Sequence, residues 1–395
     1  MSPRLDALLR VDLGGFDLDA HLVADRGVTA LLGPNGSGKT TALKALAGLH
    51  ALTSGHVRLE GRTWADQATG AHLPPEQRSV GMVLADPLLF PRLSLLDNVA
   101  YGPRSRGTRR PAARERASEE LERVGLAELA GRRPSQVSQG QAQRAALARA
   151  LATDPQLLLL DEPLSALDPQ TRSATRADLA QRLRDYDGIT VLVTHDALDA
   201  LTLGDRLVFL EGGRVVQEGT PAEVIVRPRS PYVAGVVGLN LFRGALVQDT
   251  CATHDTRARV VAHASRTSVD EDAAERDRHQ ADAGGWALDL GGGGRLVVAD
   301  PPPGAVAGEP VWATVAPETV ALFTERPRTS ARNLWPVRVV AVTVTGQRAR
   351  VRLSGIPGHE IVAEVTLAAV TELRVTTGST LWASVKATEV DVYPA

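Results

Sequence analysis

Residues 33–40 of the chain could bind the phosphates of a nucleotide. They run Gly33-Pro34-Asn35-Gly36-Ser37-Gly38-Lys39-Thr40 and complete the pattern GxxxxGK[ST]. The glycines let backbone N–H groups turn towards a phosphate, and Lys39 reaches the β- and γ-phosphates. The Thr40 hydroxyl is placed to bind Mg²⁺. A chance glycine-rich turn is the alternative, but lysine and hydroxyl follow the glycines in the order that the chemistry needs.

The flanking sequence predicts the elements that hold this loop. Val28–Leu32 is a short apolar run typical of a buried strand, and Thr41–Leu49 predicts a helix. The positive N-terminal end of that helix, which includes Thr41, faces the phosphates. Strand, loop and helix therefore follow one another as an α/β phosphate-binding unit requires.

Two further segments carry side chains suited to hydrolysis. Leu157–Leu160 predicts a buried strand that ends at Asp161, where a carboxylate can hold Mg²⁺ through water. Glu162 follows directly and can orient the attacking water or accept its proton. A buried Asp-Glu pair is costly without a cation, which favours a functional role. His195 follows the apolar run Thr190–Val193 and can hydrogen-bond a γ-phosphate, although a lone histidine is more often structural.

Composition excludes some classes of function. The 395 residues are enough for two or three domains, and 44 Lys and Arg against 46 Asp and Glu argue against a nucleic-acid partner. No apolar run approaches the length that spans a bilayer, so the chain is not itself a channel. The start of the chain lacks the pattern of a signal peptide. The single cysteine, Cys251, excludes an internal disulfide and fits a reducing cytoplasm.

The character of the sequence changes near residue 240. Before it, strand and helix patterns alternate, with helices expected at 112–130 and 138–152. Beyond it, short alternating runs such as Arg348–Leu353 predict strands. The charged segment 254–284 is typical of a loop or linker.

The second half also contains an internal repeat. Val311–Val315 recurs as Leu381–Val385, and Asn240-Leu-Phe-Arg recurs as Asn333-Leu-Trp-Pro. Two copies of one small β-unit would bury a shared core that neither copy could form alone. Chance similarity between short Val- and Ala-rich strands is the alternative.

Residues 1 to about 235 resemble the nucleotide-binding subunit of an ATP-binding-cassette (ABC) importer. Val137-Ser138-Gln139-Gly140-Gln141 is similar to the family's LSGGQ signature with two changes, and Ser165–Asp168 to its D-loop. The resemblance implies a homodimer. Each ATP would lie between the phosphate loop of one subunit and Ser138, Gly140 and Gln141 of the other, with Asp168 beside them. His195 would be the switch histidine.

Three positions depart from that family or are hard to place. Ala85 stands where the family has a glutamine that contacts Mg²⁺ and relays the state of the transmembrane subunit. Metal sensing and coupling are therefore in question. Gln139 replaces a signature glycine and adds bulk near the second ATP. Phe16 is the nearest aromatic candidate for stacking on adenine.

The end of the chain, about residues 329–393, resembles the small molybdate-binding (molbindin-like, or Mop) domain, a β-barrel of the OB type. The likeness rests on residues 329–334 and 385–390. A tetrahedral dianion suits a few hydroxyl and N–H donors and one cation. The alternative is a regulatory β-tail without a ligand site. The residues that the resemblance implies for an oxyanion site are Ser330, Arg332, Asn333, Lys386, Ala387 and Thr388.

The sequence thus predicts an α/β P-loop NTPase (ABC ATPase) domain with a helical subdomain at 1–235, followed by all-β, OB-like structure. A first β-unit is expected at 236–328 and the molbindin-like domain at 329–395. The resemblance implies the ATP- and Mg²⁺-dependent ATPase of a bacterial molybdate importer, peripheral on the cytoplasmic face of the membrane. Residues 74–103 would dock a separate permease, which a periplasmic or lipoprotein molybdate-binding protein supplies.

Two other functions stay open at this point. One is an importer ATPase for sulfate or another solute, with a purely regulatory tail. The other is a molybdate sensor or storage protein with a weakened ATPase, and Ala85 and Gln139 are the residues that keep it open.

Overall fold

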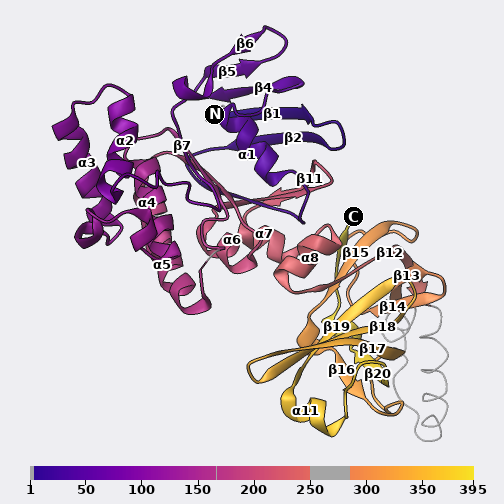
Figure 1. Ribbon diagram of the computed structural model, residues 1–395. Coiled ribbons are helices and arrows are strands. Elements are labelled where there is room, and N and C mark those ends of the chain that lie inside the picture. Colours follow the sequence, from indigo (N-terminus) through magenta and orange to yellow (C-terminus); the bar gives the residue numbers. More distant parts are fainter. Residues whose placement is uncertain (1–3, 166, 250–284) are drawn as a thin grey trace, which may run out of the picture. The chain divides into compact units, whose positions relative to one another are not determined.

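The computed structural model describes residues 4–165, 167–249 and 285–395. The chain divides into two compact units, Met1–Val226 and Arg227–Ala395 (Figure 1). The expected charged linker, 254–284, lies outside the described residues. Along the described chain, no helix has both the length and the apolar character needed to cross a membrane.

Unit 1 is built on an eleven-stranded mixed sheet in the order β6-β5-β4-β1-β2-β11-β10-β3-β9-β8-β7. From β10 to β7 all neighbouring strands are parallel. Every residue of β8 and β9 is buried, as expected where helices cover both faces of a parallel sheet. The strands are β1 Leu5–Asp12, β2 Asp17–Ala24, β3 Gly27–Leu32, β4 Ser54–Leu59, β5 Arg62–Asp66, β6 Ala71–His72, β7 Val80–Val83, β8 Leu157–Asp161, β9 Ile189–Val193, β10 Arg206–Glu211 and β11 Arg214–Gly219.

Three helices of unit 1 form the predicted helical subdomain. They are α2, α3 and α4, and they pack around a core of their own, which includes Leu95, Ala117 and Ala145. The helix expected at 112–130 is shorter than predicted, because Gly125 has φ of 64° and a 3-10 turn follows at 127–129. The helices of the unit are α1 Lys39–Ala47, α2 Leu95–Ser105, α3 Arg110–Arg123, α4 Gln139–Leu151, α5 Pro169–Asp185, α6 Ala197–Leu203 and α7 Pro221–Val226.

Unit 2 consists of two five-stranded antiparallel sheets that share one hydrophobic core. In the described part of this unit, two short helices accompany them, α8 Pro231–Val237 and α11 Leu367–Glu372. The division of this region at residue 329, drawn from the sequence, stays a prediction. The strands are β12 Asn240–Asp249, β13 Gly285–Gly291, β14 Gly294–Val298, β15 Pro310–Val315, β16 Ala321–Phe323, β17 Asn333–Thr345, β18 Arg348–Ile356, β19 His359–Thr366, β20 Thr380–Val385 and β21 Asp391–Pro394.

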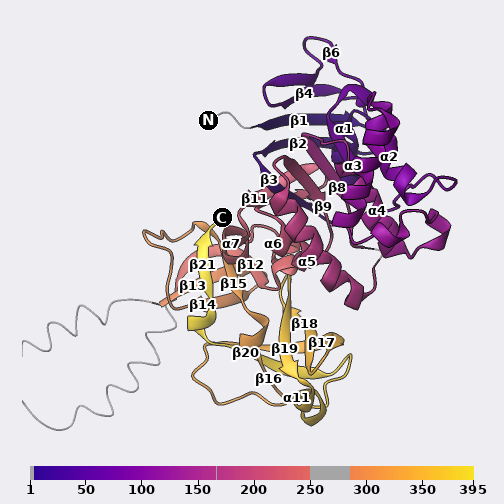
Figure 2. The same ribbon diagram turned by 90° about the vertical axis from the view of Figure 1, so that its left-hand side faces the viewer.

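The internal repeat is confirmed by the pairing of these strands. One sheet has the order β14-β13-β12-β15-β21 and the other β19-β18-β17-β20-β16, so equivalent strands occupy equivalent places. Asn240 lies opposite Val315, as Asn333 lies opposite Val385. The outermost strands are exchanged: β16 follows the first repeat but pairs with β20, and β21 follows the second repeat but pairs with β15 (Figure 2).

A pair of equivalent asparagines ties each repeat to the other. The Asn240 side chain accepts from Val362 N at 2.6 Å and donates to Val362 O at 2.9 Å. The Asn333 side chain makes the same two bonds with Val297, at 2.6 and 2.9 Å. Both amides are buried, at 4% and 2% exposure. Each therefore completes the hydrogen bonding of an edge strand, β19 or β14, in the opposite sheet.

We predict that Asn240→Ala lowers the free energy of unfolding of unit 2 by about 1–3 kcal/mol, because the partly buried N–H and C=O groups of Val362 lose their hydrogen-bond partner. Thr345→Ala, at an exposed position of β17, is the control and should change it by less than about 0.5 kcal/mol. Denaturant titration measures both. Equal effects of the two variants would contradict the assigned role.

Candidate functional site

The phosphate loop, Gly33–Gly38, connects β3 to α1. A Cβ on Gly33 would lie 2.0 Å from the Leu210 carbonyl oxygen, and one on Gly38 would lie 2.8 Å from Phe16 Cζ. Gly38 also has φ of 102°, and no side chain caps the N-terminus of α1. The glycines are thus fixed by close packing, and N–H groups of the first turn are available to an anion.

Two polar side chains of the loop are suited to a bound anion. Lys39 Nζ folds back to donate to the Gly33 and Pro34 carbonyl oxygens at 2.7 and 2.9 Å, and burial lowers the pKa of this ammonium group. The buried Ser37 hydroxyl has no hydrogen-bond partner within the described chain. A phosphate in the loop would supply acceptors for both groups, so the loop fits the nucleotide predicted from the sequence.

Thr40 and Asp161 meet where the sequence places a magnesium site. The Thr40 hydroxyl donates to Asp161 Oδ2 at 3.0 Å. Asp161 is 7% exposed, and burial, assisted by the charge of Glu162, raises the pKa of its carboxyl group. A hydroxyl and a buried carboxylate are oxygen ligands of the kind that Mg²⁺ takes, so the pair fits this cation.

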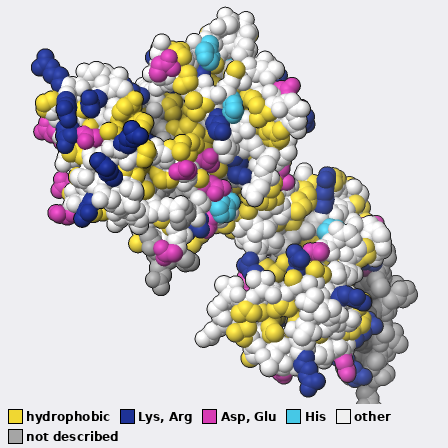
Figure 3. All heavy atoms as spheres, viewed as in Figure 1, with side chains coloured by type: hydrophobic (Ala, Val, Ile, Leu, Met, Phe, Trp, Pro, Cys, Tyr) yellow, Lys and Arg dark blue, Asp and Glu magenta, His cyan; other side chains and the backbone are white. Residues whose placement is uncertain are grey.

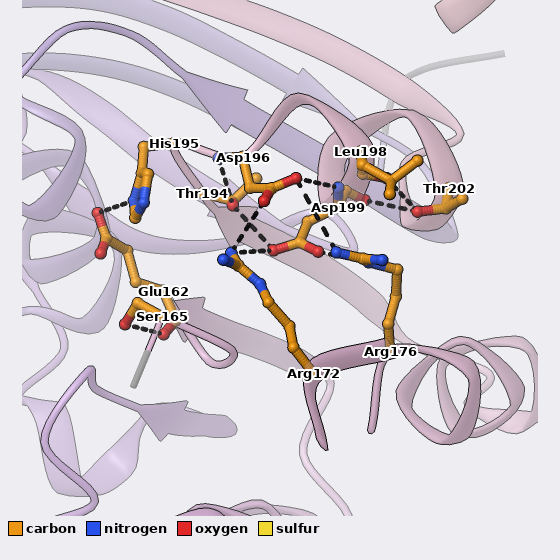
Figure 4. Close-up of polar contacts among 10 residues, drawn as sticks. All are labelled: Glu162, Ser165, Arg172, Arg176, Thr194, His195, Asp196, Leu198, Asp199 and Thr202. Atoms are coloured by element: carbon orange, nitrogen blue, oxygen red, sulfur yellow. Dashed lines mark hydrogen bonds and ion pairs between the residues drawn. The ribbon is translucent and has the colours of Figure 1, made fainter. Parts of the chain in front are cut away.

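Glu162 and His195 face each other at the carboxyl ends of β8 and β9 (Figure 4). His195 Nδ1 lies 3.1 Å from Glu162 Oε1, and the imidazole is half exposed at 51%. Glu162 has the left-handed φ of 49°, and its backbone N–H is bound to the Val193 carbonyl at 2.9 Å. The left-handed backbone thus occurs where the chain leaves β8, at the residue whose carboxylate contacts the histidine.

An ion-pair cluster unforeseen from the sequence holds the turn that carries His195. Arg172 and Arg176, one helical turn apart on α5, reach Asp196 and Asp199 after β9 (Figure 4). Arg172 lies 2.8 Å and Arg176 2.5 Å from Asp199, and Arg172 lies 3.2 Å from Asp196. We call these four residues the arginine clamp. The clamp joins α5, which begins after Asp168, to the His195 turn.

The signature residues lie at the start of α4, away from α1 (Figure 1). Ser138 Oγ accepts from Gln141 N at 3.3 Å, and Gln141 Oε1 accepts from Ser138 N at 2.9 Å. Ser138 is exposed, and no hydrogen bond among the described residues joins it to the phosphate loop. One chain thus brings together the loop, Asp161, Glu162 and His195, but not Ser138, Gly140 and Gln141. Asp168 is also exposed.

The structure also shows the surroundings of Ala85, Gln139 and Phe16, the three positions that depart from the family or are hard to place. Ala85 is exposed just after β7. The carbonyl of the preceding residue, Leu84, accepts from the buried Gln143 amide at 3.1 Å. Gln139 is exposed as the first residue of α4. The Phe16 ring contacts the phosphate loop at Gly38, and its part in adenine binding stays a prediction.

The predicted oxyanion residues come together at one end of the paired strands β17 and β20. Asn333 begins β17 opposite Val385, which ends β20 directly before Lys386. Ser330, Arg332, Lys386 and Thr388 are exposed, and their side chains make no hydrogen bond to other described residues. The Asn333 amide, by contrast, is 2% exposed and is held by one accepted and one donated hydrogen bond to Val297. Ala387 O accepts from Ala299 N at 3.2 Å.

Comparison with known proteins identifies the family. The chain matches the ABC transporter family over residues 20–165 and the TOBE domain over residues 329–392. It is 38% identical over 394 residues to the molybdenum import ATP-binding protein ModC of Mycobacterium tuberculosis, covering 98% of this chain and 97% of that protein. The chain belongs to the ABC transporter ATP-binding proteins. The predicted fold class and the predicted membership of this family are thereby confirmed, and this ABC protein is an importer ATPase.

Other ABC proteins resemble a shorter part of the chain. The spermidine/putrescine import ATP-binding protein PotA of Acidothermus cellulolyticus is 46% identical over 210 residues, which are 53% of either chain. The solved structure of cbiO1 from Clostridium perfringens, part of the ABC transporter complex cbiONQ, is 27% identical with a TM-score of 0.50. It covers 57% of this chain and 91% of its own.

For the nucleotide-free protein we predict that Asp161→Asn raises the free energy of unfolding near neutral pH. The folded pKa of Asp161 is raised, so the folded state binds this proton more tightly than the unfolded state. The wild-type penalty is therefore absent below the unfolded pKa and grows as the pH rises through the folded pKa. Denaturant titration at several pH values measures it.

The same variant should lose ATP hydrolysis by on the order of 100-fold or more if Asp161 is the magnesium ligand that the sequence predicts. Asp17→Asn, at an exposed position of β2, is the control and should change neither quantity. A destabilised Asp161→Asn variant would contradict the assigned cost of this buried charge.

The arginine clamp gives a second prediction. Arg176→Gln should lower the free energy of unfolding of unit 1 by about 3 kcal/mol, because it leaves the buried Asp199 carboxylate without one of its two cations. Arg182→Gln breaks a pair with the exposed Asp178 on the same helix and should cost at most about 0.5 kcal/mol. Similar losses in the two variants, measured by denaturant titration, would contradict a special role of the clamp.

Proposed function

We propose that this chain is the ATPase subunit of a molybdate importer and energises uptake through a separate membrane permease. The observation that carries the proposal is the extent of the similarity. The molybdenum import protein ModC matches 98% of the chain, tail included, whereas the spermidine/putrescine import protein PotA matches 53%. In this proposal the cassette is the part common to importers of different solutes, and the tail carries the information about the solute.

In the proposed mechanism, Lys39, the Ser37 hydroxyl and the N–H groups at the start of α1 bind the ATP phosphates. Thr40 and Asp161 would hold Mg²⁺, which would supply positive charge to neutralise the phosphates. Glu162 orients the attacking water and accepts its proton, and His195, 3.1 Å from Glu162, donates to the γ-phosphate.

Two copies of the chain complete each site in this proposal. Ser138, Gly140 and Gln141 at the start of α4 lie apart from the phosphate loop of their own chain, so they are available to the ATP bound by a partner (Figure 1). Because Ser138 Oγ acts as an acceptor in its own helix cap, its hydroxyl proton is free to donate to a phosphate oxygen. Asp168 would contact the same dimer interface.

The proposed contact with the permease lies on an exposed apolar surface of unit 1. Leu88 and Tyr101 are 57% and 49% exposed, and the Tyr101 ring lies 4.6 Å from that of Phe90. Figure 3 shows a broad hydrophobic patch on this unit. Surface of this kind marks a protein interface, and it would place the subunit at the cytoplasmic face of the membrane. A periplasmic or lipoprotein molybdate-binding protein would supply the permease from the other side.

In the tail, Ser330, Arg332, Lys386 and Thr388, with backbone groups near Asn333 and Ala387, would bind molybdate and regulate transport. The exposed donors of these side chains and the two cations suit a tetrahedral dianion. Sulfate has the same charge and geometry, so competition between the two anions for the full-length chain separates a molybdate importer from one for sulfate.

We predict that Glu162→Gln lowers the rate of ATP hydrolysis by on the order of 100-fold or more while ATP binding is kept, because only proton transfer is lost. Hydrolysis by the purified chain and binding of a fluorescent ATP analogue measure the two effects. Glu115→Gln, at an exposed site of α3, is the control. Equal, negligible rates in wild type and Glu162→Gln would instead favour a molybdate sensor or storage protein.

A further inference from the structure

The repeat of unit 2 gives the predicted oxyanion site an equivalent at the other end of the fold. We name the first end A, formed by residues 330–333 and 386–388, and the equivalent end B, formed by residues 237–240 and 316–318. The strand registers define the correspondence, since Asn333 lies opposite Val385 and Asn240 opposite Val315. A 3-10 turn follows each second strand at the same spacing, at 387–389 and at 317–319.

End B has lost every side chain that suits end A to an anion. Of the residue types at end A, only the asparagine at position 333 has the same residue at the equivalent position of end B, Asn240. The hydroxyl of Thr388 is replaced by the carboxylate of Glu318, which repels an anion. In the order Ser330, Arg332, Lys386 and Thr388, the equivalent residues are Val237, Leu239, Ala316 and Glu318.

Two arginines from β18 lie at end B, and both are already paired. A Cβ on Gly238 would lie 3.4 Å from Arg350 Nη2, which places this guanidinium at end B. The Glu364 carboxylate binds Arg348 at 2.7 Å and Arg350 at 3.2 Å, and its side chain is 16% exposed. Asn240 holds β19 in place through its two hydrogen bonds to Val362, two residues before Glu364.

The two ends differ in whether their cations are paired with carboxylates of the chain. At end B, Arg348 and then Arg350 lower the pKa of the Glu364 carboxyl group, so this group is an anion, and Glu318 adds a second negative charge near Arg348. At end A, Arg332 and Lys386 have no ion pair with other described residues. End B is neutralised from within the chain, whereas end A offers two cations to a ligand.

We propose that unit 2 binds one tetrahedral oxyanion per chain, at end A, and that the Glu364 carboxylate occupies the equivalent place at end B. Glu364 acts there as a built-in anion held by Arg348 and Arg350. The inference rests on the proposed oxyanion role of the tail and adds its stoichiometry, the location of the site and the residue that closes the second site.

Isothermal titration of the full-length chain with sodium molybdate tests the inference, with saturating ADP present so that the phosphate loop is occupied. We expect one anion per wild-type chain. Lys386→Gln, an exposed change at end A, should weaken binding roughly tenfold or more. Glu364→Gln should free Arg348 and Arg350 and raise the stoichiometry to two anions per chain.

Glu360→Gln is the matched control, since Glu360 pairs with Arg352 at 3.5 Å on the same two strands but is 56% exposed. It should stay at one anion per chain with unchanged affinity. Two anions per wild-type chain, or one in Glu364→Gln, would overturn this inference and leave the tail an oxyanion-binding unit. No binding heat in any variant would overturn the oxyanion role of the tail as well.

Discussion

Burial of the Asp161 carboxylate at the end of a parallel strand is the constraint around which the ATP site is arranged. The strands β3, β9 and β8 are neighbours, so the phosphate loop, His195 and the Asp161–Glu162 pair all emerge at one edge of the sheet. Thr40 gives the carboxylate one hydrogen bond, and Lys39 lies close enough to lower its pKa against the effect of burial. A site held at this cost in the empty protein is prepared to gain free energy when a cation and phosphates arrive.

The parts of this site that are adjacent in sequence could be predicted from the sequence. The phosphate loop, the strand before it and the strands ending at Asp161 and Val193 all follow from local pattern and were found where expected. The helix α2 was not foreseen, because Gly102 and Pro103 near its end obscure the helical period. The arginine clamp was also missed. It joins α5 to a turn more than twenty residues away, and neither segment is unusual by itself.

In the tail, the sequence predicted the repeat, but it did not predict how the strands of the two repeats pair. Matching residues such as Asn240 and Asn333 indicated two copies, and the repeated apolar strands predicted the shared core that the structure has. The exchange of β16 and β21 left no signal, because strands of three and four residues carry too little pattern to assign a partner. The hydrogen bonds of the two asparagines could not be predicted either, because their partners, Val362 and Val297, are distant in the sequence and lie in the opposite sheet.

The exchanged strands also bear on how the tail folds and unfolds. β21, at residues 391–394, follows the second repeat, yet it completes the sheet that begins with β12. The first repeat alone would therefore keep an open edge beside β15, and the second repeat alone would lack β16. We therefore expect the two repeats to fold and unfold as one cooperative unit.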